Sequence, residues 1–214
     1  IPRQIPEPTR IPQAVFPKKL VPTWPDHLPS VLKLDVPLLT LLGLTTSEGL
    51  INQPVLTIYN IDKDVLALIS SSATLVGATT TPRRASGSTQ IKGYAIGPNA
   101  WAKLFVALGA GGSSGTKRVP PTLLTATNDQ VSAYLRAYYE GDGTVSSKEV
   151  SCTSKSSVLI GDLAYLLLRF GIVGRIREKH KRATNSNSPP GTYWELVISG
   201  ATNVESFAQH IGFL

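Results

Sequence analysis

The sequence predicts an α+β protein in which one αβαββα unit occurs twice, so that two similar halves are related by pseudo-twofold symmetry. Two observations support this fold. The order helix, strand, helix, strand, strand, helix can be traced twice along the chain. The first helix of each copy also ends in an acid followed by glycine, at Glu48 and at Asp142, which offsets the copies by 94 residues. An internal duplication is the simplest explanation.

The composition is that of a globular protein with a packed core, because 42% of the 214 residues are hydrophobic and only 16% are charged. The single cysteine, Cys152, excludes an intrachain disulfide, and three scattered histidines lack the spacing of a structural zinc site. Any catalytic metal is therefore expected on carboxylates. No apolar run has the length of a membrane span, and the start lacks a signal-peptide pattern, so we expect a soluble, intracellular protein.

Residues 1–36 are expected to form a proline-rich basic arm. Nine of the 16 prolines lie within the first 37 residues, where they disfavour helix and favour extended backbone. Two interpretations stay open, a strap packed against the domain or an arm lying along a polyanion. The chain contains no methionine, so we expect it to have been processed or excised from a longer product.

The first copy, residues 37–109, is expected to begin with a helix that ends before Gly49. Leucines recur at helical spacing between 38 and 44, and glycine is a common helix stop. The other segments follow in order: a strand at 53–60, a helix at 62–75, two strands within 77–96 and a helix at 98–109.

A flexible linker at 110–121, rich in glycine and serine, leads to the second copy at 122–214. The same kinds of segment recur there, and Gly171 is the expected C-cap of the middle helix. The predicted elements are a helix at 128–143, a strand at 144–153, a helix at 155–171, strands at 174–182 and 192–199, and a helix at 201–212.

The two acid-glycine helix ends are the candidate catalytic constellation. Either end alone is typical of an ordinary core helix with a cap. If the two helices pack together through small residues, the two acids are brought side by side, although a carboxylate at a helix C-terminus opposes the macrodipole. A divalent cation between them would offset that cost, as in metal-assisted phosphodiester hydrolysis. The small residues that allow the approach are Gly43, Ser47, Ala137 and Gly141.

At this point the sequence resembles the LAGLIDADG (dodecapeptide-type) homing endonucleases, and specifically the single-chain members with two motif copies. The resemblance covers about residues 37–214. It implies a pseudo-twofold fold with a DNA-binding β-saddle, and a monomeric, site-specific endonuclease that cuts double-stranded DNA at a long, degenerate site and leaves 3′ overhangs. It also implies dependence on Mg²⁺, for which Ca²⁺ or Mn²⁺ can substitute. The segments that carry it are LLGLTTSEG at 41–49, LRAYYEGDG at 135–143, KRVPP at 117–121, and the blocks at 156–176 and 194–213.

Carried over residue by residue, the resemblance places the two metal-binding acids on Glu48 and Asp142 and the basic active-site residue on Lys117. Thr45 and Thr46 stand where the motif usually has apolar residues, which leads us to expect a looser or shifted helix interface. The matching lysine of the second copy would fall near position 219, after the last residue of the sequence. The stand-ins considered are Lys148 and Arg175.

Strand parity predicts the DNA-contacting face. In GRIREKHKR the odd positions put four cations on one face, which fits either a solvated edge strand or a surface that reads the major groove. Polar residues alternate in the same way in the first copy. The predicted DNA-binding residues are Asn52, Gln53, Thr57, Arg83, Arg84, Ser88, Gln90, Lys92 and Tyr94 in the first copy, and Thr144, Ser146, Lys148, Arg175, Arg177, Lys179, Lys181 and Tyr193 in the second.

The leading hypothesis is therefore a metal-dependent DNA endonuclease encoded by an intron or an intein. The alternative is a catalytically degenerate relative that acts as an RNA-splicing maturase or as a DNA-binding protein. Retention of both Glu48 and Asp142 argues against degeneration.

Overall fold

The computed structural model describes residues 10–12, 28, 31–181 and 191–213. The predicted proline-rich arm therefore lies mostly outside the described residues. Two short strands of it are described, β1 (Arg10–Pro12) and β2 (Val31–Lys33), and they pair antiparallel. Within the described ranges, no helix has the length and apolar character needed to cross a membrane.

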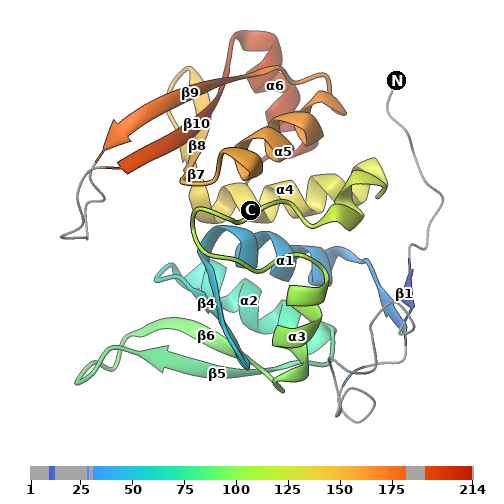
Figure 1. The fold of residues 1–214 in the computed structure, drawn as a ribbon, viewed down its shortest axis with the longest axis vertical. Helices are drawn as coiled ribbons and strands as arrows, with labels where there is room; N and C mark the ends of the chain where they lie inside the picture. Colours follow the sequence, from blue (N-terminus) through green and yellow to red (C-terminus); the bar gives the residue numbers. More distant parts are fainter. Residues whose placement is uncertain (1–9, 13–27, 29–30, 182–190, 214) are drawn as a thin grey trace.

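Two units of the same architecture make up the rest of the molecule (Figure 1). The first consists of α1 (Val36–Glu48), β3 (Gly49–Asn52), β4 (Val55–Tyr59), α2 (Lys63–Leu75), β5 (Thr79–Arg84), β6 (Ile91–Gly97) and α3 (Ala100–Ala107). A 3₁₀ turn, η4 (Pro121–Leu124), precedes the second unit. That unit consists of α4 (Asn128–Asp142), β7 (Gly143–Val145), β8 (Glu149–Ser154), α5 (Ser157–Leu168), β9 (Gly174–Lys181), β10 (Gly191–Ser199) and α6 (Ala201–His210).

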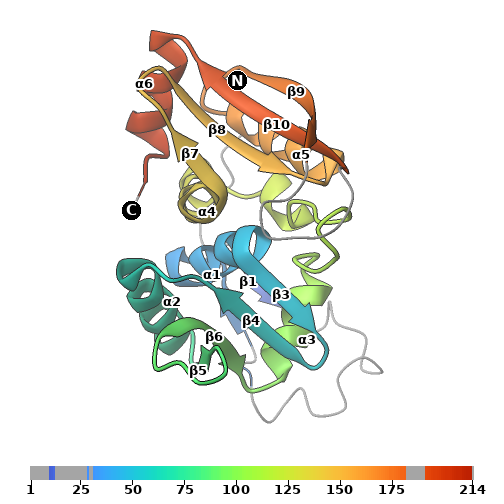
Figure 2. The same ribbon diagram turned by 90° about the vertical axis from the view of Figure 1, so that its left-hand side faces the viewer.

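The two sheets confirm the predicted duplication. One has the strand order β3-β4-β6-β5 and the other the order β7-β8-β10-β9, and all neighbouring strands are antiparallel. Helices α1 and α4 lie side by side at the centre of the molecule, with one sheet on each side of the pair (Figures 1 and 2). Each first helix therefore leads directly into the first strand of its own sheet.

The first strand of each copy is in fact a two-stranded hairpin, so the unit is αββαββα and not αβαββα. The segment predicted as one strand at 144–153 bends between β7 and β8, where the Ser146 hydroxyl accepts a hydrogen bond from the Glu149 amide at 3.2 Å. In the first copy the chain enters β3 immediately at Gly49, before the predicted start at 53. The sequence analysis missed both hairpins because each contains a very short strand without a clear alternating pattern.

Glycine follows each motif acid for a steric reason. Gly49 and Gly143 both have extended backbone, with φ of −82° and −78°, so they are not selected for a left-handed turn. A Cβ on Gly49 would collide with the carbonyl of Thr45, and one on Gly143 with the carbonyl of Tyr139. The absence of a side chain lets the chain pass from helix to strand within one residue.

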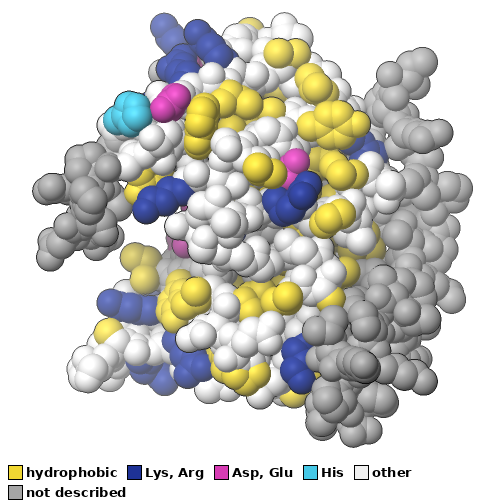
Figure 3. All heavy atoms as spheres, in the orientation of Figure 1, with side chains coloured by type: hydrophobic (Ala, Val, Ile, Leu, Met, Phe, Trp, Pro, Cys, Tyr) yellow, Lys and Arg dark blue, Asp and Glu magenta, His cyan; other side chains and the backbone are white. Residues whose placement is uncertain are grey.

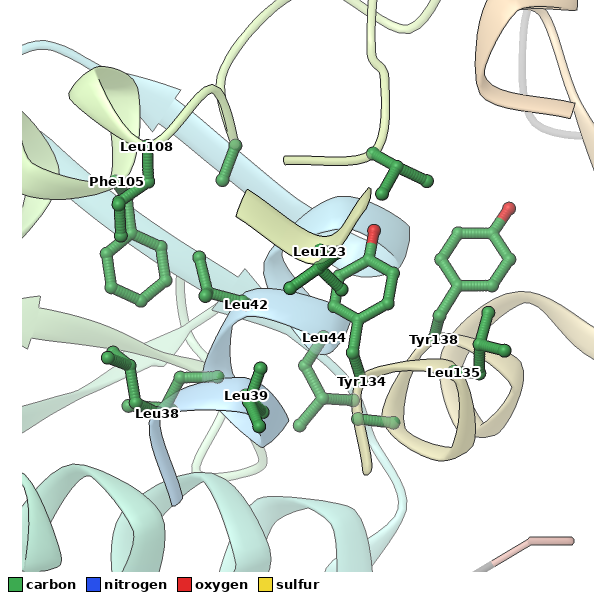
Figure 4. Close-up of a cluster of buried hydrophobic side chains, with 14 of the residues drawn as sticks. Leu38, Leu39, Leu42, Leu44, Phe105, Leu108, Leu123, Tyr134, Leu135 and Tyr138 are labelled. Atoms are coloured by element: carbon green, nitrogen blue, oxygen red, sulfur yellow. The ribbon is translucent and has the colours of Figure 1, made fainter. Parts of the chain in front are cut away.

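The α1–α4 interface is tight, contrary to the expectation of a loosened contact. A Cβ on Gly43 would lie 2.5 Å from the carbonyl oxygen of Tyr134 and 2.7 Å from the Cβ of Ala137, so the helices touch backbone to side chain. Thr46 fits the interface because its hydroxyl donates to the Leu42 carbonyl at 2.9 Å and accepts from the Tyr134 hydroxyl at 3.1 Å. Leucines of α1 and the tyrosines of α4 fill the surrounding core (Figure 4).

Replacing Gly43 with alanine is expected to destabilise the fold by about 1–3 kcal/mol, because the added methyl group forces the two central helices apart. Gly161 is a matched control, since it also lies inside a helix and a Cβ there would meet nothing within 4 Å. Gly161→Ala should be neutral or stabilising by up to about 1 kcal/mol. Urea denaturation of both variants measures the difference, and equal midpoints would refute close packing at Gly43.

Candidate active site and nucleic-acid interface

The two motif acids meet where the central helices end. Glu48 is the last residue of α1 and Asp142 the last residue of α4, and both are partly buried. The ends approach closely because Gly141 has no side chain. A Cβ there would lie 2.8 Å from the Cβ of Ser47 and 2.9 Å from the Cγ of Glu48. The structure thus brings together the two acids that the sequence predicted to be adjacent.

Burial dominates the electrostatics of both acids. It raises the pKa of Glu48 to about 7, the charge of Asp142 adds to the increase, and Lys117 acts to lower it. Burial also raises the pKa of Asp142 to about 6, against the lowering effects of Lys117 and of the neighbouring Tyr138 hydroxyl. Two carboxylates that share a poorly solvated space disfavour each other's ionised form, and a nearby cation relieves this cost.

Lys117 reaches this space from the segment between the two units. Its Nζ donates a hydrogen bond of 2.9 Å to the carbonyl oxygen of Ser47, in the last turn of α1. Burial lowers the pKa of Lys117, while the charges of Asp142 and Glu48 act to raise it. The side chain therefore caps one motif helix and places its ammonium group near both acids.

The backbone of Lys117 is held by the second unit. The Ser156 hydroxyl, which caps α5 by accepting from the Leu159 amide, also donates to the Lys117 carbonyl at 2.6 Å. Asp162 accepts from the Val119 amide at 3.2 Å and lies 3.7 Å from the Arg118 guanidinium. The linker predicted at 110–121 is thus anchored at its C-terminal end, and Asp162 is not the first-turn acid that its sequence position suggests.

Each acid opens onto its own cavity. A cavity of about 340 Å³ beside Asp142 is also lined by Lys117, Lys155 and Tyr193. Glu48 faces a second cavity of about 330 Å³, where Lys92 provides a cation. The two stand-ins considered from the sequence, Lys148 and Arg175, line neither cavity. Strand parity could not indicate Lys155, because this residue lies beyond the end of β8.

The residues at the site fit a divalent cation of the Mg²⁺ or Ca²⁺ type. Such ions prefer carboxylate, carbonyl and water oxygens, and two partly buried carboxylates lie here at adjoining helix ends, where their ionisation is disfavoured. Among the described residues, no cluster of three or more His, Cys, Asp or Glu side chains is present. The remaining coordination positions would therefore fall to backbone carbonyls, water and substrate oxygens.

In the second unit the predicted cationic face forms as expected from strand parity. Arg175 is opposite Val197, Arg177 opposite Glu195 and Lys179 opposite Tyr193, so these residues share one face of the sheet. Lys179 is already engaged, since its Nζ donates to the buried Glu195 carboxylate at 2.6 Å. Lys181 ends β9, and its side chain lies outside the described part of the chain. Thr144, Ser146 and Lys148 are exposed on and beside β7.

The first unit departs from the prediction at two residues. Tyr94 is opposite Ile58 and packs against the core, not on the polar face, because a register shift between Arg83 and Arg84 interrupts the alternation. Thr57 is only 6% exposed, which leaves it little surface for DNA. Ser88 is partly exposed, and the other predicted residues of this unit are exposed: Asn52, Gln53, Arg83, Arg84, Gln90 and Lys92.

The hairpins β5–β6 and β9–β10 extend from the body on the same side (Figure 1), and most of the visible Lys and Arg side chains gather along that side (Figure 3). Clustered cations on one side of a basic protein are the electrostatic pattern of a nucleic-acid interface. The acids and Lys117 lie where the two units meet.

Comparison with known proteins supports the fold and the second motif. Residues 129–212 match the profile of the LAGLIDADG-like domain family. Replication factor C small subunit of Methanocaldococcus jannaschii is 35% identical over 107 residues, half of this chain and 5% of the relative. A DNA gyrase of Mycolicibacterium flavescens is 28% identical over 184 residues, 80% of this chain and 31% of the relative. The chain thus spans less than a third of either relative.

Solved structures extend the likeness to both units. I-DmoI in complex with DNA and Mn matches with a TM-score of 0.58 and 13% identity, over 83% of this chain and 98% of that chain. Full-length DUF199/WhiA from Thermatoga maritima matches with a TM-score of 0.59 and 10% identity, over 84% of this chain and 56% of that chain. The chain therefore belongs to the LAGLIDADG family, with a LAGLIDADG-like domain at residues 129–212 and both units of the fold in one polypeptide.

Proposed function

We propose that this chain is a site-specific, metal-dependent endonuclease that acts as a monomer, cuts one phosphodiester in each strand of double-stranded DNA, and leaves 3′ overhangs. The observation that carries the proposal is the meeting of Glu48 and Asp142, from two equivalent helices, beside Lys117. Duplex DNA also has two similar strands of opposite direction, and a pseudo-twofold protein with two equivalent acids can present one to each strand.

The chemistry we propose divides between the acids and the lysine. Glu48 and Asp142 would hold Mg²⁺, which when bound makes a hydroxide nucleophile available and stabilises the attacking and leaving oxygens. Lys117 stabilises negative charge on the scissile phosphate, or orients a water molecule through its ammonium group. The Ser47 carbonyl holds that ammonium group, and Ser156 holds the Lys117 backbone. That I-DmoI has been solved in complex with DNA and Mn, and with DNA and Ca, supports divalent metal use.

DNA binding in this proposal rests on the cationic face described above. Phosphate contacts by lysine and arginine supply affinity that falls as salt rises, while the hairpin side chains read base edges in the major groove. Two four-stranded sheets, one per unit, suit a long recognition site that tolerates some sequence variation.

Replacing both Arg175 and Arg177 with glutamine should reduce the salt dependence of DNA binding. If each contacts one phosphate, the slope of log K against log salt becomes shallower by about 1.8. Fluorescence anisotropy with Ca²⁺ at several salt concentrations measures the slope. Lys103→Met is the control, because it removes a cation from α3, on neither the predicted DNA face nor the cavities. An unchanged slope in the arginine variant would remove β9 from the interface.

The proposed function itself is tested with a randomised library of double-stranded DNA. Incubation with Mg²⁺ should enrich cut ends that carry a 3′ overhang, and a parallel pull-down with Ca²⁺ should recover the same sequences uncut. Selective pull-down without cutting would favour the DNA-binding alternative. An absence of both would reject a role on double-stranded DNA and leave the maturase alternative, which binding to structured RNA would test.

We also propose that the chain is encoded inside host genes, as intron- or intein-borne endonucleases are. The relatives bear names of unrelated proteins, including replication factor C, translation initiation factor IF-2 and DNA gyrase, and the matched segment covers 5%, 8% and 31% of them. A segment shared by proteins with such different names behaves as a portable unit. Sequencing the genomic locus and its transcript would test this, and an independent gene with its own promoter would refute it.

A further inference from the structure

We propose that Lys155 is a further catalytic residue, specific to the half-site of Asp142, and that the strand served by Asp142 is consequently cut first. The inference rests on the proposed endonuclease function. It concerns a residue that the motif resemblance does not identify, and it explains what supplements Lys117 in a chain whose two halves are not chemically identical.

Lys155 lies at the wall of the Asp142 cavity. It follows β8 directly, and its Nζ lies 5.4 Å from the centroid of the Tyr193 ring, over which a cation is attracted. Tyr193 lies on β10 and lines the same cavity as Asp142 and Lys117. The Lys155 ammonium group is therefore held on the sheet side of this cavity, whereas Asp142 enters it from a helix end.

The pairing of the two sheets shows what occupies the equivalent place in the other half. Gly49 is paired with Ile58, and its counterpart Gly143 is paired with Cys152. Counting three residues onward from each partner reaches Ile61 in the first unit and Lys155 in the second. Ile61 is 66% exposed and lines the cavity of Glu48. One half thus carries an ammonium group where the other carries a hydrocarbon side chain.

The Glu48 cavity does contain a cation, but from a different place. Lys92 lies on β6, one strand away from the position of Ile61. The Asp142 cavity is lined by both Lys117 and Lys155, whereas Lys92 is the lysine lining the Glu48 cavity within the described chain. The two half-sites are therefore unequal in positive charge.

This difference has a direct chemical consequence. Hydrolysis of a phosphodiester builds negative charge on the phosphate oxygens, and a positioned cation lowers the barrier by stabilising that charge. The phosphate at Asp142 would be faced by two ammonium groups and the phosphate at Glu48 by one. The strand at Asp142 is expected to react faster, so that a duplex nicked in that strand accumulates before the double-strand break.

The test uses a duplex with the recognition site recovered from the library and a different fluorophore on the 5′ end of each strand. Under single-turnover conditions with Mg²⁺, the wild-type protein should cut one strand before the other. Lys155→Met should slow the first-cut strand by about 100-fold, leave the second nearly unchanged, and retain binding with Ca²⁺. Lys155→Arg should restore much of the rate, because it keeps the charge. Lys103→Met should not change either rate.

The reciprocal variant Ile61→Lys should speed the slower strand and reduce the delay between the two cuts. If the wild-type protein cuts both strands and Lys155→Met leaves both rates unchanged, or slows both equally, the inference is overturned while the proposed function stands. A slow strand that is unaffected by Ile61→Lys would overturn the assignment of the asymmetry to this position. A wild-type protein that cuts no DNA would overturn the proposed function itself.

Discussion

Glu48→Gln and Asp142→Asn should each slow double-strand cleavage by at least about 10³-fold, while DNA affinity measured with Ca²⁺ changes little. Each substitution keeps the size of the side chain but removes a carboxylate from the pair that would hold the metal. Affinity is retained because the cationic face of β9 and the hairpin residues lie apart from the helix ends. Single-turnover cleavage of the labelled duplex and anisotropy on the same DNA measure both quantities.

The control for this prediction is Glu205→Gln, which removes an exposed carboxylate from α6, away from the helix ends. This variant should cleave at the wild-type rate. If either acid variant loses binding together with cleavage, the two acids support the fold or the interface and not the chemistry. If either variant still makes double-strand breaks at the normal rate, the assignment of Glu48 and Asp142 is wrong.

The central part of the site could be predicted because its determinants are local. The leucine spacing fixes α1, and an acid followed by glycine marks the end of both α1 and α4. Gly43 and Gly141 then leave room for the helices to approach, which brings Glu48 and Asp142 together. These are properties of two short segments, so the sequence indicates them without knowledge of the rest of the fold.

The parts that could not be predicted depend on contacts between distant segments. Ser156 and Asp162 hold the backbone beside Lys117 from α5, about 40 residues further along the chain. Nothing in their local pattern distinguishes them from an ordinary helix cap and a surface acid. Tyr94 was misplaced for a related reason, since strand parity assumes unbroken pairing and a register shift in the neighbouring strand β5 interrupts it.

The stability of the metal-free protein is expected to fall as pH rises from about 4 to about 7. In the folded protein the pKa of Glu48 is raised from 4.5 to about 7 and that of Asp142 from 3.8 to about 6. Across this window the folded state keeps protons that the unfolded chain has already released, so raising the pH favours unfolding. Allowing for solvent screening of these partly buried groups, the loss is about 1–3 kcal/mol.

A divalent cation should reverse this loss, because it binds the ionised pair and lowers the pKa of both acids. Ca²⁺ at 100 times its dissociation constant should stabilise the fold by about 2.7 kcal/mol at pH 8. Glu48→Gln should be more stable than the wild type at pH 8 in EDTA and should respond only weakly to Ca²⁺, whereas Glu205→Gln should behave as wild type. Urea denaturation at pH 5 and pH 8, with EDTA or with Ca²⁺, provides the comparison. A wild-type protein whose stability is the same at both pH values and insensitive to Ca²⁺ would contradict the buried acid pair as the metal site, independently of any measurement of DNA cleavage.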